Sequence, residues 1–508
     1  MKQLSKTRLI AHRQCPKRMW LEMYKPKLRK DTPDTLASFD VGHTVGDIAR
    51  YLYDPEQKGV LFNANRDGFP AAFRRSKELL NSDLPLFEVG YSTEGAYAFA
   101  DVMLPVVQNG QRMWRMIEVK SSTGVKEYHR DDVAIQAYVA RHAGVPLQSI
   151  ALAHIDNSFV YPGQDDYRGL LKECDLTEAT FSRDDEVRGW ISAAQVTAAM
   201  ASEPSISTGT HCSTPFSCGF HEYCSSQETQ PEFPVHWLPY NQSPEFRGYV
   251  DEHPGLDLRD VPDGLLSDLQ RRVKTHTLNG TVYFDADGAA AELAKYSLPA
   301  LFLDFETIQR AIPVWGGTRP YQQIPFQFSL HILDVHGKLT SQAFLDLSRD
   351  DPSRPFSEAL VTACCGNGPI FVYNAGFEGG RIRELADRFA DLSDALLAIK
   401  DRLVDLLPIT RTHYYNPTQR GSWSIKAVLP AIAPDLSYEK LEGVQNGGMA
   451  MEAYQEATCP YTGLCKKKTL EKQLLAYCGL DTFAMVRLWQ FLSGRHEFKF
   501  ENLYVQAT

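Results

Sequence analysis

Asp101 and the tripeptide Glu118-Val119-Lys120 combine residue types that can hold a metal ion beside a cation. Both lie in apolar segments that are typical of neighbouring strands. Because side chains alternate along a strand, Glu118 and Lys120 share a face while Val119 turns into the core. Carboxylate oxygens suit Mg²⁺ or Mn²⁺, and the ammonium group can activate water or stabilise charge on a phosphorane. Such residues are also common as ordinary surface charges. The surrounding sequence therefore has to distinguish a metal site from a charged surface.

The second half of the chain carries acidic residues in three separate segments. Asp304 and Glu306 close a predicted strand and point the same way, so their carboxylates can bind two cations about 4 Å apart. Glu378 belongs to a segment that follows another predicted strand and opens a helix. Tyr477 and Asp481 are one helical turn apart on a long predicted helix, and therefore lie on one face. Each segment alone is common, but all three in this order are hard to reach by chance.

Four cysteines are spaced as ligands of one site would be. Cys212, Cys218 and Cys224 are evenly spaced in a short segment, and Cys15 lies far upstream. The chain starts without the apolar core of a secretory signal, so structural disulfides are not expected. Four thiolates suit either a [4Fe–4S] cluster or zinc, and zinc could also use His211 or His221. Free buried cysteines are the remaining interpretation.

The elements that must position these residues form two α/β regions. In the first, hydrophobic periodicity predicts helices over 5–11, 39–53 and 132–142, and strands over 87–91, 97–107, 112–119 and 149–155. In the second, it predicts strands over 298–305, 326–335, 339–347 and 370–373, and helices over 356–364 and 470–492. Residues 226–297 contain many prolines and are predicted to be a connector, with some helix around 265–272.

Composition favours a folded protein of two or three domains. Of its 508 residues, 43% are hydrophobic and 23% are charged, as in ordinary globular chains. There is no uninterrupted apolar run of membrane-spanning length, so no membrane association and a cytoplasmic location are expected. The net charge of −10 argues against a chain that coats nucleic acid non-specifically. Residues 1–30 hold ten Lys or Arg against one acid, which indicates either a solvated basic arm or a phosphate-binding surface.

With these elements placed, residues 1–225 resemble the PD-(D/E)xK nucleases, and among them the RecB-like group that carries an iron–sulfur cluster. The order helix, three strands, helix, strand matches the core of that restriction-endonuclease-like fold. The residues that the resemblance implies as catalytic are Asp101, Glu118, Lys120 and Gln136, with Asp101 and Glu118 as metal ligands. The ligands that it implies for a [4Fe–4S] cluster are Cys15, Cys212, Cys218 and Cys224.

Two features depart from that pattern. The family's Gln-x-x-x-Tyr motif is imperfect, since Tyr138 follows Gln136 by two residues. The family usually has a histidine in the early helix, a few residues after a glycine, where this chain has Gly46 or Asp47. Either His43 substitutes for that ligand or the ligand is missing. If it is missing, the N-terminal domain is a nucleic-acid-binding platform without catalysis.

Residues 298–495 resemble the DnaQ-like (DEDD) 3′–5′ exonucleases of the ribonuclease H-like fold. Asp304 and Glu306 match the first motif. The segment from Asn374 to Glu378 matches the second, with Glu where the family generally has Asp, and Tyr477 with Asp481 matches the third. The resemblance implies catalysis by these carboxylates and by Tyr477, which positions the attacking water. It also implies two Mg²⁺ or Mn²⁺ ions, whose ligands would be Asp304, Glu306 and Asp481.

The whole arrangement resembles an uncharacterised bacterial family that fuses these two parts. That family also carries a segment like Gly421–Lys426, so Asn374, Ser424 and Lys426 are expected to contact a phosphate or a terminal nucleotide. The leading hypothesis is a metal-dependent nuclease in DNA repair or anti-phage defence, acting on single-stranded DNA or 3′ ends, with RNA also open. The second hypothesis is the N-terminal nucleic-acid-binding platform without catalysis, and the third is a non-enzymatic scaffold. Protein partners are unknown. Residues 501–506 resemble a protease tag and carry no functional argument.

Overall fold

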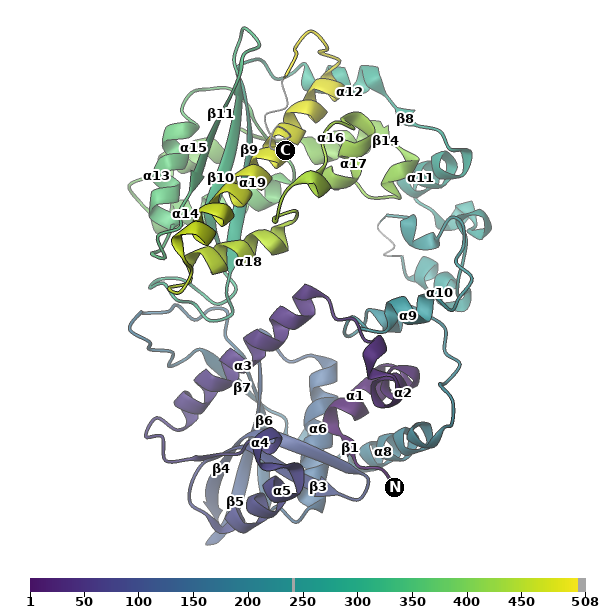
Figure 1. The fold of residues 1–508 in the computed structure, drawn as a ribbon, viewed down its shortest axis with the longest axis vertical. Coiled ribbons are helices and arrows are strands. Elements are labelled where there is room, and N and C mark those ends of the chain that lie inside the picture. Colours follow the sequence, from purple (N-terminus) through teal and green to yellow (C-terminus); the bar gives the residue numbers. More distant parts are fainter. Residues whose placement is uncertain (240–242, 501–508) are drawn as a thin grey trace. The chain divides into compact units, whose positions relative to one another are not determined.

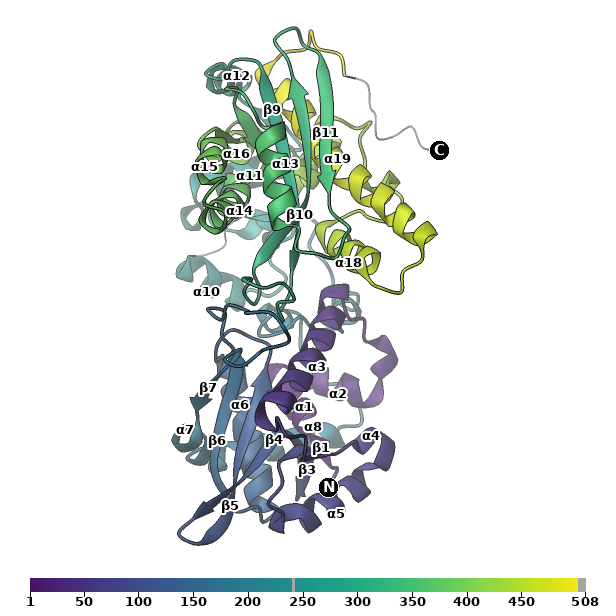
Figure 2. The same ribbon diagram turned by 90° about the vertical axis from the view of Figure 1, so that its left-hand side faces the viewer.

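A computed structural model describes residues 1–239 and 243–500 (Figures 1 and 2). It is a mixed α/β protein, as the sequence predicts. The chain divides into two compact units. Unit 1 contains Met1–Gln230 and Arg310–Tyr321, and unit 2 contains Pro231–Gln309 and the chain from Gln322 onward. None of the helices in the described ranges is long and apolar enough to cross a membrane. The tag-like segment 501–506 lies outside the described residues.

Unit 1 is built on one twisted sheet. Its strands run in the order β2 (Val60–Leu61), β3 (Leu86–Thr93), β4 (Ala96–Gln108), β5 (Gln111–Lys120), β6 (Leu147–Ile155) and β7 (Leu171–Asp175), and β1 (Leu4–Ser5) adds to β4. β3, β4 and β5 are antiparallel neighbours, whereas β6 lies parallel to β5. The strands predicted from alternation are confirmed, and β1, β2 and β7 are additional strands that were not predicted.

Helices cover both faces of this sheet (Figure 1). Three helices pack on one face through a continuous apolar core: α1 (Lys6–Gln14), α6 (Glu127–His142) and α8 (Asp184–Ala199). On the other face lies α3 (Pro33–Tyr53), which contributes Tyr53. The remaining helices are α2 (Pro16–Tyr24), α4 (Ala64–Asp67), α5 (Phe69–Glu78), α7 (Thr177–Phe181) and α9 (His221–Ser225).

A second stretch of chain completes unit 1. Residues 310–321 belong to it although they lie between two strands of unit 2. Ala311 is buried with Val45 and Ile155 in a small apolar cluster. The backbone of Tyr161 donates to the carbonyl of Thr318 over 2.9 Å and accepts from Gly317 over 2.7 Å. This segment is therefore held by both packing and backbone hydrogen bonds.

Unit 2 is a sheet between two helical layers (Figure 2). Its strand order is β11 (Leu339–Leu345), β10 (Gln323–Leu333), β9 (Ala300–Gln309), β12 (Ile370–Val372) and β13 (Leu403–Asp405). β9, β10 and β11 are antiparallel, and β12 and β13 run parallel to β9. One face packs on α13 (Ser353–Ala363), α14 (Ala375–Arg388) and α15 (Ser393–Lys400).

The other face of this sheet carries the long helix α19 (Leu464–Ser493). Leu303 of β9 packs against the α13–α15 layer, while Phe302 packs against α19. Because side chains alternate along β9, Asp304 and Glu306 lie on the α19 side with Phe302. The helices that complete this layer are α16 (Leu406–His413), α17 (Ile425–Ile432) and α18 (Gly447–Thr458).

The proline-rich residues predicted to be a connector contribute to the core of unit 2. From Pro231 onward they form α10 (Pro244–Glu252), α11 (Asp268–Asn279), β8 (Tyr283–Phe284) and α12 (Ala286–Leu293), and β8 pairs with β14 (Tyr414–Tyr415). Leu258, Val261 and Val273 are buried in the same cluster as Phe302. The prediction of a connector was wrong because apolar residues lie between the prolines. These residues are buried in the core, whereas a solvated linker would not need them.

Candidate functional sites

An ion-pair network in unit 1 contains the predicted residues Glu118, Lys120 and Gln136. Glu118 is 1% exposed and accepts hydrogen bonds from Lys120 over 2.6 Å, from Lys6 over 2.9 Å and from the amide of Gln136. Asp132 of α6 binds the same two ammonium groups, at 2.5 Å from Lys120 and 3.1 Å from Lys6. Burial opposes ionisation of Glu118, but the two lysines outweigh it and hold its pKa well below the ordinary value.

Asp101 lies where β4 and β5 separate. The pairing of these strands ends at Val102 and Ile117, and the carboxylate of Asp101 then accepts a hydrogen bond from the backbone N–H of Val119 over 2.7 Å. Burial raises the pKa of Asp101 well above its ordinary value, and Glu118 raises it further. Asp101 and Glu118 are thus neighbours, as alternation along the two strands predicts. His43, the alternative to the missing histidine, is exposed on α3.

The four predicted cluster ligands line one cavity in unit 1. Cys15 joins α1 to α2, and Cys212, Cys218 and Cys224 approach it from the far end of the unit's main segment. All four are free thiols, and Lys17 and Arg18 line the same cavity. Burial raises the pKa of Cys224 to about 11, so metal binding there would release a proton. Four thiols beside two cations are the donor types of an anionic iron–sulfur cluster or of zinc, but among the described residues no three of these sulfur atoms lie within 4.8 Å of one another, as they would around a single zinc ion.

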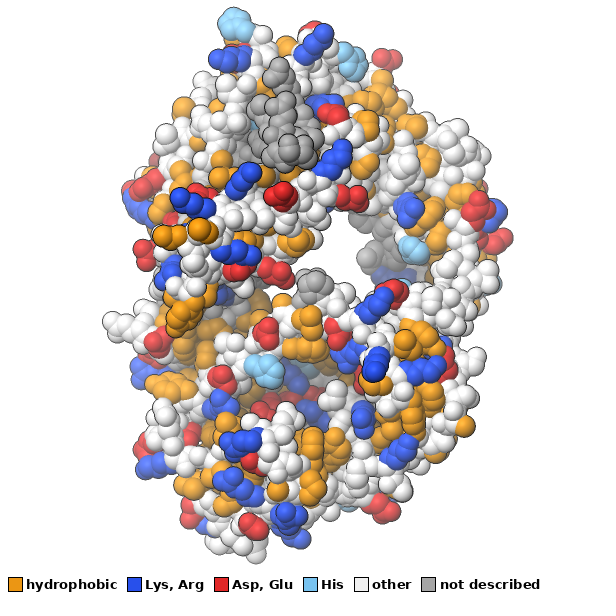
Figure 3. Space-filling model, viewed as in Figure 1, with side chains coloured by type: hydrophobic (Ala, Val, Ile, Leu, Met, Phe, Trp, Pro, Cys, Tyr) orange, Lys and Arg blue, Asp and Glu red, His pale blue; other side chains and the backbone are white. Residues whose placement is uncertain are grey.

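Most basic residues of the first thirty are paired with acids. The pairs include Arg13 with Asp131 at 3.2 Å and Lys30 with Glu222 at 2.6 Å. Basic and acidic side chains are intermixed on the face of unit 1 drawn in Figure 3. The basic segment is thus not a free solvated arm, and it does not form a surface of uniformly positive charge.

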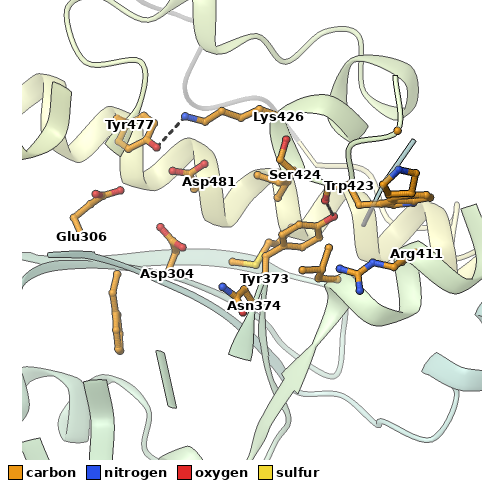
Figure 4. A pocket seen from close by; sticks show the side chains of 16 residues that line it. Asp304, Glu306, Tyr373, Asn374, Arg411, Trp423, Ser424, Lys426, Tyr477 and Asp481 are labelled. Atoms are coloured by element: carbon orange, nitrogen blue, oxygen red, sulfur yellow. Dashed lines mark hydrogen bonds between the residues drawn. The ribbon is translucent and has the colours of Figure 1, made fainter. Parts of the chain in front are cut away.

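A cavity of about 540 Å³ in unit 2 is lined by the predicted residues of three separate segments (Figure 4). Asp304 and Glu306 enter from β9, and Tyr477 and Asp481 enter from α19. Asn374, Ser424 and Lys426 also line it. Residues from a strand, a strand–helix junction and two helices therefore meet at one place.

Hydrogen bonds fix several of these side chains. The hydroxyl of Tyr438 donates to Oδ1 of Asp481 over 2.5 Å. The ammonium group of Lys426 lies 3.1 Å from the hydroxyl oxygen of Tyr477 and donates to the carbonyl of Gln445 over 3.0 Å. Its Nζ also lies 4.8 Å from the ring centres of both tyrosines. One lysine thereby holds the predicted water-positioning tyrosine from the side opposite β9 (Figure 4).

The carboxylates at this cavity are crowded. Burial raises the pKa of Asp304 well above its ordinary value, and Asp481 and Glu306 raise it further. The pKa of Glu306 is raised in the same way, by burial and then by Asp481. Burial raises the pKa of Asp481 to about 6, although the hydrogen bond from Tyr438 lowers it. A divalent cation would relieve this repulsion.

Three ligand atoms at this cavity are close enough to share one cation. Asp304, Glu306 and Cys478 each offer one, and these atoms lie within 4.8 Å of one another. The sulfur of Cys478 is 3.8 Å from Oδ2 of Asp304. The residues present therefore fit a metal ion.

Glu378 differs from the other predicted residues. It is 2% exposed on α14, outside the lining of the cavity, and its Oε2 has no hydrogen-bond partner within the described chain. Burial raises its pKa to about 8, and the charge of Asp405 adds to this. Asn374, one turn earlier, has φ of +94°, and Asp405 accepts from its N–H over 3.0 Å and from that of Ala375 over 2.9 Å. Asp405 thus holds the turn that brings Asn374 to the cavity.

Residues 301–424 match a domain family described as "Domain of unknown function (DUF2779)". An alignment of 212 positions, which covers 38% of the chain, is 26% identical to the uncharacterised protein MG366 of Mycoplasma genitalium. It spans about a third of that protein, 32% of its length.

The DUF2779 match begins on β9 and ends at Ser424, so it contains Asp304, Glu306 and Asn374 but not the α19 residues. Sequence reasoning did not single out Lys6, Asp132 or Tyr438. Asp132 precedes Gln136 by one helical turn, a spacing that could have indicated it. Lys6 and Tyr438 reach their partners across long stretches of chain, and neither has a local signal.

Proposed function

We propose that this protein is a metal-dependent nuclease whose unit 2 removes nucleotides from 3′ ends. The observation that carries the proposal is the meeting of Asp304, Glu306, Tyr477 and Asp481 in one cavity. These residues come from two segments far apart in the chain, and the DEDD resemblance implies a catalytic role for each of them. The strand order of unit 2, three antiparallel strands followed by two parallel ones, supports a ribonuclease H-like fold.

In this proposal Asp304 and Glu306 hold a cation. The resemblance implies two cations at this site. A bound Mg²⁺ or Mn²⁺ supplies a Lewis acid for the phosphate and lowers the pKa of a bound water. The hydroxyl of Tyr477 orients that water, and its neighbour Lys426 offsets negative charge that develops on the phosphate. Asn374 and Ser424 are the N-cap residues of α14 and α17, and both line the cavity. They are placed to contact the sugar–phosphate of the terminal nucleotide.

For unit 1 we propose a second nuclease domain, of the PD-(D/E)xK type, closed by a [4Fe–4S] cluster. Its support is the single cavity lined by Cys15, Cys212, Cys218 and Cys224. A cluster there would join the two ends of the unit's main segment. A platform without catalysis is the second candidate, because Lys6, Lys120 and Gln136 already occupy both oxygens of Glu118.

The experiment uses 3′- and 5′-labelled single-stranded DNA and RNA with Mn²⁺. Wild-type protein is compared with Asp304→Ala, Asp481→Ala and Lys120→Ala, each checked for folding by circular dichroism. Stepwise loss from the 3′ end that disappears in the first two variants supports the exonuclease. Full activity in both would overturn it. If Lys120→Ala leaves all cleavage unchanged, unit 1 is the binding platform.

A further inference from the structure

Three polar side chains are buried together where α19 crosses β10 in unit 2. Ser329 and His331 are two residues apart on β10 and therefore share the face that α19 covers. Thr482 meets them from α19. Thr482 and His331 are 0% exposed, and Ser329 is 3% exposed. Burying polar groups is costly unless they are hydrogen-bonded, so the partners of all three have to be accounted for.

The hydroxyl of Thr482 is the centre of this group. Its Oγ1 lies 2.8 Å from Oγ of Ser329, 2.9 Å from Nδ1 of His331 and 3.1 Å from the carbonyl oxygen of Gly479, one turn earlier in α19. A hydroxyl has one hydrogen to donate and two lone pairs that accept. Donation to the carbonyl of Gly479 leaves Thr482 to accept from both Ser329 and His331. Burial lowers the pKa of His331 to about 4, so its ring is neutral and carries its hydrogen on Nδ1 in this arrangement.

This group joins the two elements that carry the carboxylates of the cavity. Ser329 is directly opposite Asp304 in the pairing of β10 with β9. Thr482 directly follows Asp481 on α19. The bond between Ser329 and Thr482 therefore links the strand position of Asp304 to the helix position of Asp481. Apolar contacts of α19 with the sheet are non-directional, whereas a buried hydrogen bond fixes both the rotation and the height of the helix.

We propose that Thr482 is a positioning residue of the unit 2 cavity. Its bonds to Ser329 and His331 hold α19 at one rotation over the sheet, so that Asp481 stays at the separation from Asp304 that a shared cation site requires. Thr482 does not line the cavity and acts only through Asp481. The role matters because a displacement of about 1 Å can cost on the order of a hundredfold in rate. The inference rests on the proposed metal-dependent function of unit 2.

The test compares Thr482→Val, which has a similar shape without the hydroxyl, with Thr482→Ser, which keeps the hydroxyl. Nucleotide release from 3′-labelled single-stranded DNA with Mn²⁺ gives kcat and KM. We expect Thr482→Val to lower kcat at least about tenfold, because the carboxylates are displaced. KM should be nearly unchanged, since Asn374 and Ser424, which are proposed to contact the substrate, stand on other elements. Thr482→Ser should retain most of the rate.

Thr277→Val is the matched control for the loss of a buried hydroxyl. Thr277 is 4% exposed, and its Oγ1 lies 2.6 Å from the hydroxyl oxygen of Tyr415, outside the cavity lining. This variant should lower Tm, as Thr482→Val does, but leave kcat unchanged. Ser329→Ala removes the other end of the bond. Because both changes break the same interaction, Ser329→Ala combined with Thr482→Val should lose little more kcat than Thr482→Val alone.

Wild-type kcat in Thr482→Val would overturn the proposal. An equal loss of kcat in Thr482→Ser or Thr277→Val, or additive losses in the double variant, would overturn it as well. Mn²⁺ binding separates these outcomes from failure of the proposed function. If the wild-type protein degrades no substrate, isothermal titration calorimetry still measures the part of Mn²⁺ binding that Asp304→Ala removes. Thr482→Val should weaken that part, and unchanged affinity would exclude the positioning role. If Asp304→Ala removes no Mn²⁺ binding, the proposed metal function fails and this role fails with it.

Discussion

The hydroxyl of Tyr438 lies 2.5 Å from Oδ1 of Asp481, to which it donates a hydrogen bond. Tyr438 belongs to a short 3₁₀ turn (Tyr438–Lys440), whereas Asp481 is in the middle of α19. The bond lowers the pKa of Asp481 against the opposing effect of burial. It also fixes one carboxylate oxygen, so the other is oriented within the cavity.

Tyr438→Phe should therefore shift the acidic limb of the pH–rate profile of 3′-end degradation to higher pH. Without the hydroxyl, Asp481 becomes harder to ionise. At neutral pH the rate should fall about tenfold, the usual consequence of losing a hydrogen bond to a charged group. Tyr283→Phe, outside the cavity, is the matched control. A profile identical to wild type would mean that the bond does not influence Asp481.

Lys426→Met should lower kcat on the order of a hundredfold, as loss of one donor to a developing anion commonly does. The ammonium group contacts Tyr477 and also lowers the pKa of Glu306. Lys426→Arg, which keeps the charge, should retain part of the rate. Lys440→Met removes an exposed lysine nearby and should behave as wild type. The same loss of kcat in both methionine variants would contradict this role.

Cys218→Ser should lose bound iron, because its thiol is one of four that line the cavity in unit 1. Cys174→Ser, in β7 and outside that cavity, should retain it. Iron and sulfide content after anaerobic purification, with the visible absorbance of the protein, measure the difference. Zinc without iron in wild-type protein would replace the cluster by a tetrahedral metal site. Equal iron in both variants would argue against cysteine ligation here.

Glu378→Gln should stabilise the protein at alkaline pH. The pKa of Glu378 is raised to about 8, so the stabilising contribution of its protonated form is complete below the unfolded pKa and is lost as pH rises through 8. A shift of this size corresponds to about 5 kcal/mol as an upper bound. Chemical denaturation at pH 5 and pH 9 should show near-equal stability at the lower pH and a more stable variant at the higher. Parallel pH dependence would contradict it.

The parts of the site with a local signal could be predicted from the sequence. Asp304 and Glu306 close a clear apolar strand, and Tyr477 and Asp481 lie one turn apart on a long amphipathic helix. These residues meet because β9 pairs with β10 and because α19 crosses that sheet. The predicted order of strands and helices was sufficient to expect both contacts.

Other contacts could not be predicted because they join distant segments without a pattern. Lys6 reaches Glu118 across more than a hundred residues, and Tyr438 stands in a loop that no periodicity marks. β13 has only three residues, too few to show alternation, although its Asp405 holds the turn at Asn374. The many prolines between residues 231 and 297 indicated a connector, but leucines and valines among them are buried and pack on α19 and β9.

The interruption of unit 2 by residues 310–321 affects how the protein can be dissected. Because this stretch packs within unit 1 while β9 and β10 on either side belong to unit 2, cleavage after Gln230 leaves the N-terminal fragment without part of unit 1, and that part stays attached to unit 2. Limited proteolysis at that junction should yield fragments that co-purify rather than two free domains. An expressed 1–230 fragment would expose the apolar surface that Ala311 covers, beside Val45 and Ile155.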